Sequence, residues 1–292
     1  MATQAEAGAH GHHEVHHPYH LVDPSPWPIV GSISALTLVV GGLMYMHEIH
    51  VLGIALGPWV MLLAVLGLAF TLVPWWRDVI HEGRTGHHTD VVSKGLRIGM
   101  ALFITSEVLF FFAFFWAYFW GALNHPMDVE GYTWLPQGVH PVDAWDVPFL
   151  NTLILLLSGC TVTWAHHCVR EGDNRTATKA LALTVLLGIL FTSFQAYEYI
   201  HTIYSPEGFQ ISSGIFGSTF YMATGFHGFH VMIGTTFLIV CTVRAYYAHF
   251  RPDKHVGLEA AAWYWHFVDV VWLFLFTWVY WWGGYIARAA GH

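Results

Sequence analysis

Seven long apolar segments divide this 292-residue sequence, and each is near or above the length that crosses a membrane as a helix. About 20 apolar residues are needed to cross about 30 Å of hydrocarbon in the α-helical conformation. The segments lack the strict alternation of apolar and polar residues that a membrane β-strand would show. We therefore predict an all-α, polytopic membrane helix bundle. Its expected segments are at about 28–46, 52–74, 92–122, 148–168, 178–201, 214–243 and 260–286.

The scarcity of charge supports this prediction. Only 10% of the residues are Asp, Glu, Lys or Arg, whereas a soluble domain has about 25%. A water-soluble protein of this length would need more polar residues to cover its surface. The formal net charge of -8 also argues against nucleic acid as a partner.

Lys and Arg gather in alternate connections, which predicts the orientation of the chain. Ten of the 11 basic residues fall on one side of a seven-helix arrangement. The side rich in Lys and Arg is usually the cytoplasmic side. We therefore expect a bacterial cytoplasmic (inner) membrane, with the N-terminus cytoplasmic and the C-terminus periplasmic, and we favour the mitochondrial inner membrane less. The ten residues are Arg77, Arg84, Lys94, Arg97, Arg170, Arg175, Lys179, Arg244, Arg251 and Lys254.

The lengths of the connections predict two helical units. Residues 1–26 form a polar, His-rich N-terminal tail, and residues 27–76 form a two-helix unit. A polar cytoplasmic loop over 77–91 separates this unit from a five-helix unit over 92–292. A long connection at this point leaves room for a cleft between the two units.

The tail contains a pattern typical of zinc proteases, His13-Glu14-Val15-His16-His17. That pattern binds zinc only on a helix, where the two histidines share one face. The tail has no apolar periodicity that would make it helical. We interpret it as a solvated His-rich segment that can bind adventitious metal or buffer protons.

Glu107 is the strongest candidate for a functional residue. It lies midway through the third apolar segment, and its neighbours at helical spacing are Phe103, Ile104, Phe110 and Phe111. Burial in such surroundings favours the neutral carboxyl over the carboxylate. An acid at mid-membrane is a functional candidate by default. The alternative is a protonated Glu that only bonds a neighbouring helix.

Further polar residues recur at helical spacing in the last three apolar segments. His227 and His230 are three residues apart and share a face, as do His266 and Asp269. Glu198 lies near one end of the fifth segment. Heme or copper ligation would need several histidines at one depth, whereas the expected topology spreads them. We therefore predict an intramembrane polar network and no metal ligands.

These residues lie within stretches that resemble subunit III of the aa3-type cytochrome c oxidases of bacteria and mitochondria. The resemblance runs from about residue 28 to residue 283, and the last stretch alone is nearly sufficient for it. The matching stretches are residues 74–78 (PWWRD), 105–111 (TSEVLFF), 163–167 (TWAHH), 223–228 (ATGFHG) and 259–272 (EAAAWYWHFVDVVW).

The resemblance implies seven helices arranged as two plus five around a V-shaped, lipid-filled cleft. It also implies that the chain binds no cofactor of its own, since heme a and copper belong to partner subunits I and II. The chain would then be a non-catalytic subunit of an oxidase that reduces oxygen and pumps protons. It would stabilise subunit I over many turnovers and sustain proton uptake. A respiratory supercomplex is a further candidate partner.

The resemblance also implies roles for individual residues. Glu107 matches the family's carbodiimide-reactive acid, which a protonated carboxyl in an apolar place would explain. The residues that would contact phospholipid in the cleft are Trp75, Trp76, Glu82, His88 and Arg244.

Two other classes of function stay open at this stage. A transporter could use Glu107 and the intramembrane histidines as a proton or metal relay, and it would show uptake as an isolated chain. A redox enzyme in its own right would bind heme or copper in the single chain. Related quinol oxidases have a shorter third subunit of five helices, so the first two apolar segments argue against that assignment.

Overall fold

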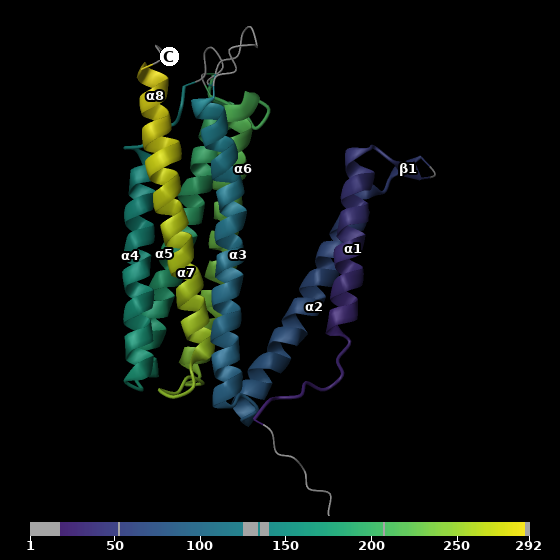
Figure 1. Ribbon diagram of the computed structural model, residues 1–292, viewed down its shortest axis with the longest axis vertical. Helices are drawn as coiled ribbons and strands as arrows, with labels where there is room; N and C mark the ends of the chain where they lie inside the picture. The colour runs from purple at the N-terminus through teal and green to yellow at the C-terminus, as the bar shows by residue number, and fades with distance from the viewer. Residues whose placement is uncertain (1–17, 52, 125–133, 135–139, 207, 290–292) are drawn as a thin grey trace, which may run out of the picture. The chain divides into compact units, whose positions relative to one another are not determined.

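The computed structural model describes residues 18–51, 53–124, 134, 140–206 and 208–289 (Figure 1). This part of the chain holds seven helices that are long and apolar enough to cross a membrane, so the predicted all-α membrane fold is confirmed. The chain divides into two compact units, Met1–Gly95 (unit 1) and Leu96–His292 (unit 2). The HExxH pattern of the tail lies outside the described residues.

Unit 1 is a pair of helices packed along their length (Figure 1). Helix α1 spans Trp27–Met46 and helix α2 spans Gly57–Thr85. A short antiparallel hairpin of β1 (His50–Val51) and β2 (Ile54–Ala55) lies between them. The hairpin pairs backbone groups in the connection, where they would otherwise need water as a partner.

Small residues let α1 and α2 approach closely. A methyl group added at Gly41 would lie 2.8 Å from the backbone nitrogen of Met61, and one added at Gly57 would lie 2.6 Å from that of Tyr45. Lipid gives helices no hydrophobic reason to associate, so such close backbone packing carries much of the association. The glycines therefore stabilise the pair in a way that larger residues could not.

The predicted loop over 77–91 is wrong for most of its length. Helix α2 continues through Pro74 and the charged residues after it to Thr85, and α3 begins at Asp90. Gly86 ends α2 with a φ of 95°, a conformation that glycine adopts without strain. The sequence prediction failed because it ended the helix where the apolar run ends, whereas a helix can extend beyond the hydrocarbon into the polar headgroup layer. The boundary between the units falls at Gly95, inside α3.

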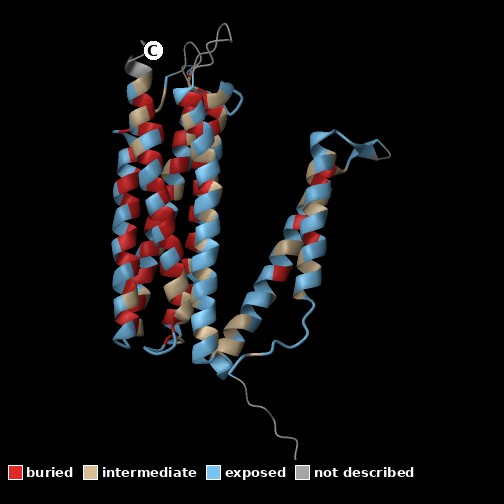
Figure 2. Ribbon diagram, in the orientation of Figure 1, coloured by how far each residue is buried: buried red, intermediate tan, exposed pale blue. Residues whose placement is uncertain are grey.

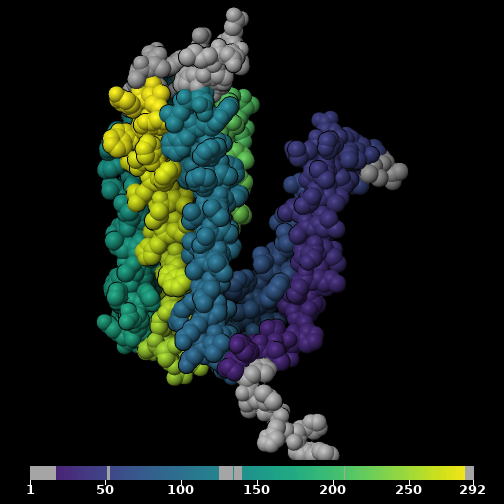
Figure 3. Space-filling view, viewed as in Figure 1, coloured from purple at the N-terminus to yellow at the C-terminus, as the bar shows by residue number. Residues whose placement is uncertain are grey.

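Unit 2 is a bundle of long helices whose buried residues lie mainly on α4 to α7 (Figure 2). Helix α3 and the C-terminal part of the chain lie side by side on the visible face of this unit (Figure 3). They are in contact through Phe115 of α3 and Phe274 near the end of α7, whose ring centroids are 4.4 Å apart. The helices are α3 (Asp90–Leu123), α4 (Val147–Arg170), α5 (Asn174–Tyr204), α6 (Gly214–Tyr246), α7 (Val256–Leu275), the π-helical segment η1 (Phe276–Trp282) and α8 (Gly283–Ala289).

Trp265 of α7 lies at the centre of this bundle and is fully buried. Its indole nitrogen donates a hydrogen bond to the hydroxyl of Ser158 on α4 at 2.8 Å. Its ring fits against Gly188 of α5 and Gly234 of α6, where an added methyl group would lie 2.8 Å and 2.9 Å from ring carbons. One side chain thus contacts three neighbouring helices.

We predict that Gly234→Ala destabilises unit 2, because the new methyl group would overlap the ring of Trp265. Overpacking of this kind costs about 1–3 kcal/mol. Gly228→Ala on the same helix is the matched control, since an added methyl group meets nothing within 4 Å there. The temperature at which the purified protein loses its helical circular dichroism measures both. Equal denaturation temperatures for the two variants would contradict the packing described for Trp265.

Candidate functional site

The sequence-predicted acid Glu107 is paired with His230. Oε2 of Glu107 on α3 lies 2.9 Å from Nε2 of His230 on α6. The side chain of Glu107 is 21% exposed and that of His230 is 9% exposed. The neighbours of Glu107 at helical spacing on α3 are apolar, as predicted, and its partner comes from a different helix.

The hydrogen bond made by the second ring nitrogen of His230 determines where the hydrogens of this pair lie. Nδ1 lies 2.6 Å from the carbonyl oxygen of Phe226, which can only accept, so Nδ1 carries a hydrogen and donates it. A single proton then joins Nε2 to Glu107. It belongs either to a neutral carboxyl that donates to the ring or to an imidazolium that donates to the carboxylate. The net charge of the pair is zero in both cases, which avoids an unpaired charge in an apolar region.

Aromatic side chains surround this acid–histidine pair. The ring centroid of His230 lies 5.0 Å from that of Phe111 and 6.3 Å from those of Tyr264 and Phe267. These rings keep water away from the bond between Glu107 and His230. A hydrogen bond is electrostatically stronger in such surroundings than in water.

His227 has a different partner from His230, although the two share a helix. Its Nε2 donates to the backbone carbonyl of Val268 on α7 at 3.1 Å, and the residue is 1% exposed. Its ring packs against those of Trp272, which is tilted relative to it, and Phe191, which meets it edge-on, with centroids 5.2 Å and 5.7 Å away. The two histidines therefore do not converge on one ligand.

His266 and Asp269 lie on one face of α7, as their spacing predicts. Nδ1 of His266 is 3.5 Å from Oδ2 of Asp269, and its Nε2 is 3.1 Å from the hydroxyl of Thr163 on α4. Asp269 is buried, whereas the side chain of His266 is 46% exposed. The histidine thus covers a buried carboxyl at the surface of the bundle.

Glu198 belongs to a third polar group that sequence analysis described only in part. Its Oε1 accepts hydrogen bonds from the hydroxyl of Tyr280 at 2.7 Å and from the amide of Gln195 at 3.0 Å. Gln195 could have been found, because it lies three residues before Glu198 within an apolar run. Tyr280 could not, because it lies in the π-helical segment η1, whose residues do not follow α-helical spacing.

The residues expected to bind phospholipid lie in both units. In unit 1, Trp75 and Trp76 are exposed on α2, and Oε2 of Glu82 lies 4.0 Å from Nδ1 of His20. His88 is half-buried in the short connection that follows α2. In unit 2, the guanidinium of Arg244 lies 4.6 Å above the ring of Phe250. Lipid binding by these residues stays a prediction.

Comparison with known proteins identifies the family. A family model described as cytochrome c oxidase subunit III matches residues 17–284. The chain belongs to this family. Proteins named cytochrome c oxidase subunit 3 from Arabidopsis thaliana and Marchantia polymorpha are each 55% identical to it, over 92% of this chain and 97% of each relative. The protein of that name from Osphranter robustus is 53% identical over 91% of this chain and 98% of its own length.

These relatives correct the predicted location. The sequence alone favours a bacterial cytoplasmic membrane, but the relatives come from plants, algae and a mammal and point to the mitochondrial inner membrane. The error has a physical reason: the asymmetry of Lys and Arg reports which side of a membrane a loop faces, and it does not report which membrane.

Family membership makes the chain part of an oxidoreductase complex that contains other oxidase subunits. It also suggests that the chain has no metal cofactor of its own. The predicted resemblance to subunit III is confirmed over nearly the whole length of the chain.

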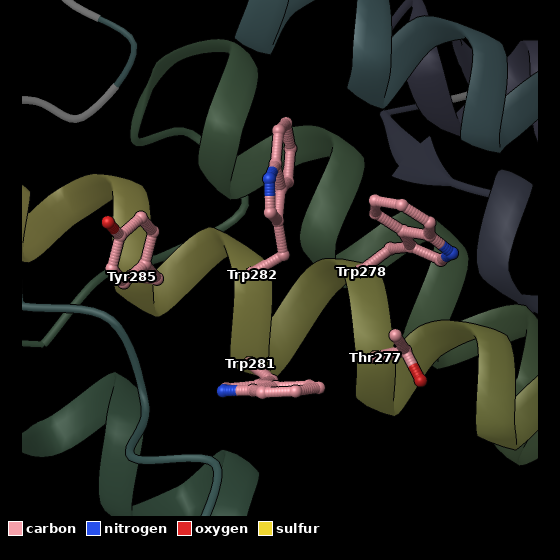
Figure 4. A pocket seen from close by; sticks show the side chains of 5 residues that line it. All are labelled: Thr277, Trp278, Trp281, Trp282 and Tyr285. Atoms are coloured by element: carbon pink, nitrogen blue, oxygen red, sulfur yellow. The ribbon is translucent and has the colours of Figure 1, made fainter.

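A surface pocket of about 310 Å³ lies along η1 and the start of α8 (Figure 4). Its lining residues carry no carboxylate, imidazole or ammonium group, and their polar atoms are the hydroxyls of Thr277 and Tyr285 and the indole nitrogens. Trp and Tyr are enriched where a helix meets the membrane–water interface. We interpret the pocket as part of such an aromatic belt. Its lining residues are Thr277, Trp278, Trp281, Trp282 and Tyr285.

We predict that Glu107→Leu destabilises the bundle more than Glu107→Gln does. The glutamine amide can still donate to Nε2 of His230, whereas leucine leaves that nitrogen buried without its partner. An unsatisfied buried polar group costs about 1–3 kcal/mol. Thermal denaturation of the purified complex measures the difference, and equal stability of the two variants would contradict the bond between Glu107 and His230.

Proposed function

We propose that the chain is a non-catalytic accessory subunit of its oxidase. In this proposal it stabilises the oxygen-reducing subunit I, contacts subunit II, binds structural phospholipids and supports proton uptake. Heme a and copper would be held by the partner subunits. The observation that carries the proposal is that the intramembrane acids and histidines described above find their partners within their own unit.

The histidines support an accessory role over a redox role. His227 bonds to a backbone carbonyl, His230 to a carbonyl and to Glu107, and His266 to Thr163. Each imidazole is therefore oriented by its own neighbours, and the three do not face one point. A heme or copper centre would need nitrogen lone pairs directed at a common position.

The acid–histidine pair supports a role in proton handling. The proton between Oε2 of Glu107 and Nε2 of His230 can sit on either atom without changing the charge of the pair. The carboxyl of Glu107 is also 21% exposed, so a lipid-soluble reagent can reach it from the membrane side of unit 2. A transporter would use the same groups, but it would move protons across liposomes as an isolated chain.

We predict that a lipid-soluble carbodiimide labels Glu107 in the intact complex. A carbodiimide reacts with the protonated carboxyl, and the pair holds such a proton within an apolar environment. Glu107→Gln should abolish labelling, while the complex still assembles because the amide keeps the bond to His230. Peptide mass spectrometry of the labelled chain locates the adduct.

Glu198→Gln is the matched control for this experiment. Glu198 is a second intramembrane acid, but it is only 4% exposed and bonds to Tyr280 and Gln195. Its replacement should leave labelling unchanged. Labelling that persists in Glu107→Gln and disappears in Glu198→Gln would contradict the assignment.

Lipid binding is proposed for the tryptophans, Glu82 and His88 of unit 1 and for Arg244 of unit 2. A guanidinium is well suited to phosphate, because it is planar, always charged and can donate two parallel hydrogen bonds. Arg244 lies near the end of α6, in the part of the sequence where basic residues gather, and its stacking on Phe250 orients it. Association with a respiratory supercomplex stays a prediction.

We predict that Arg244→Gln lowers the amount of anionic phospholipid that co-purifies with the complex and shortens its working life during turnover. The initial rate of oxygen reduction should be unchanged, since the chain is proposed to be non-catalytic. Arg251→Gln is the control, because it removes the same charge from an exposed loop where Arg251 pairs with Asp253. Unchanged lipid content, measured by mass spectrometry, would refute the lipid contact. A fall in initial rate would refute the accessory role.

A further inference from the structure

Three potential metal ligands converge at one end of unit 2, away from Glu107 and His230. They are His166 near the end of α4, His255 just before α7, and Glu259 in the first turn of α7. One ligand atom from each lies within 4.8 Å of the other two. The Nε2 atom of His255 is already 3.2 Å from Oε1 of Glu259.

Hydrogen bonding directs two lone pairs of this cluster at each other. Nδ1 of His255 lies 3.0 Å from the carbonyl oxygen of Arg251, which can only accept, so Nδ1 carries the hydrogen. In the neutral ring, Nε2 then presents a lone pair to the carboxylate oxygen of Glu259. Two lone pairs at 3.2 Å do not attract, so a proton or a metal ion is needed between them.

His166 distinguishes between these two possibilities. Its Nε2 atom is buried and has no hydrogen-bond partner in the described part of the chain. Its ring centroid lies 5.3 Å from that of His255. An ion pair between protonated His255 and Glu259 would use only two of the three groups. A metal ion would use all three and would satisfy the buried nitrogen of His166.

The surrounding groups match those that normally support a bound metal. Arg97 donates to Oε2 of Glu259 at 2.6 Å and, at a longer distance of 3.3 Å, to Oε1. These two bonds orient the carboxylate, and Oε1, which has a second lone pair, also lies 3.2 Å from Nε2 of His255. The carbonyl of Arg251 fixes the ring of His255 in the same way. In metal sites a ligating histidine generally donates its other ring N–H to a carboxylate or a backbone carbonyl, and a ligating carboxylate accepts further hydrogen bonds.

We propose that His166, His255 and Glu259 bind a divalent transition-metal ion, and that zinc(II) fits them best. Zinc is commonly held by two histidines and one carboxylate, with a fourth position left for water. Zinc–ligand distances of about 2.0–2.1 Å in a tetrahedron place neighbouring ligand atoms about 3.3 Å apart. The His255–Glu259 pair already has this separation, and rotation of the His166 ring would bring its nitrogen closer.

The proposed ion would link the end of α4 to the start of α7. It is an exchangeable ion rather than a redox cofactor, so it differs from the centres of the partner subunits. Because the ion would bind only the folded arrangement of the two helices, zinc should raise the denaturation temperature of unit 2. This inference departs from the sequence-based expectation that the chain binds no metal, and it does not depend on the proposed accessory role.

The test is zinc binding by the purified oxidase complex. The complex is dialysed against metal-free buffer and titrated with zinc, and bound zinc is counted per heme a by mass spectrometry. His166→Gln removes one ligand and none of the hydrogen bonds described above, so it should fold normally. We expect it to lose one zinc ion per complex, or to bind that ion at least about tenfold more weakly. Zinc bound at other sites of the complex is the same in wild type and variant, so it does not contribute to the difference between them.

Two further variants make the result decisive. His255→Gln should lose the same ion, and His167→Gln should keep it, because His167 is the exposed neighbour of His166 and lies outside the cluster. Zinc should also raise the denaturation temperature of wild type and of His167→Gln, but not of the two ligand variants. Wild-type affinity in either ligand variant, or an equal loss in His167→Gln, would overturn the proposal.

Discussion

The indole of Trp265 lies where four helices of unit 2 meet, and the packing of this unit depends on it. In lipid, apolar side chains gain little by leaving their surroundings, so helices associate through close contact and hydrogen bonds. Trp265 provides both, since it fills the space left by Gly188 and Gly234 and donates to Ser158. Trp272, two turns further along α7, repeats the donation to Thr152 on α4. α7 is thereby held at the centre, and more than half of its residues are buried.

A central α7 decides where polar groups can be placed. On α7, the carbonyl of Val268 bonds to His227 of α6, and Asp269 pairs with His266. In η1, which continues α7, the hydroxyl of Tyr280 bonds to Glu198 of α5. The start of α7 likewise brings Glu259 to Arg97 and His255. These polar contacts are therefore consequences of one packing arrangement, and a change in the tilt of α7 would alter several of them together.

The sequence predicts the helices well because the length of an apolar run is a local property. It also singles out Glu107, since an acid in a run of Phe and Leu is conspicuous. The partner of Glu107 is 123 residues away, and only the packing of α6 against α3 brings it close. The same is true of the cluster at Glu259, whose members are unremarkable one by one. The predicted end of α2 is wrong because hydropathy does not report how far a helix continues into the headgroup layer. The predicted membrane is wrong because the asymmetry of Lys and Arg does not report which membrane holds the chain.

The π-helical segment η1 determines what happens when the number of residues near the end of the chain changes. A wider turn accommodates about one more residue than an α-helical turn, so the helix beyond it is rotated by about 100° relative to a regular continuation. The hydroxyl of Tyr280 reaches Glu198 from within this wider turn. A deletion of one residue between Phe276 and Trp282 would therefore let the segment close as a regular α-helix, and α8 would keep its rotation about the helix axis. It would leave the composition of the segment almost untouched, yet it would remove the wider turn from which Tyr280 reaches Glu198.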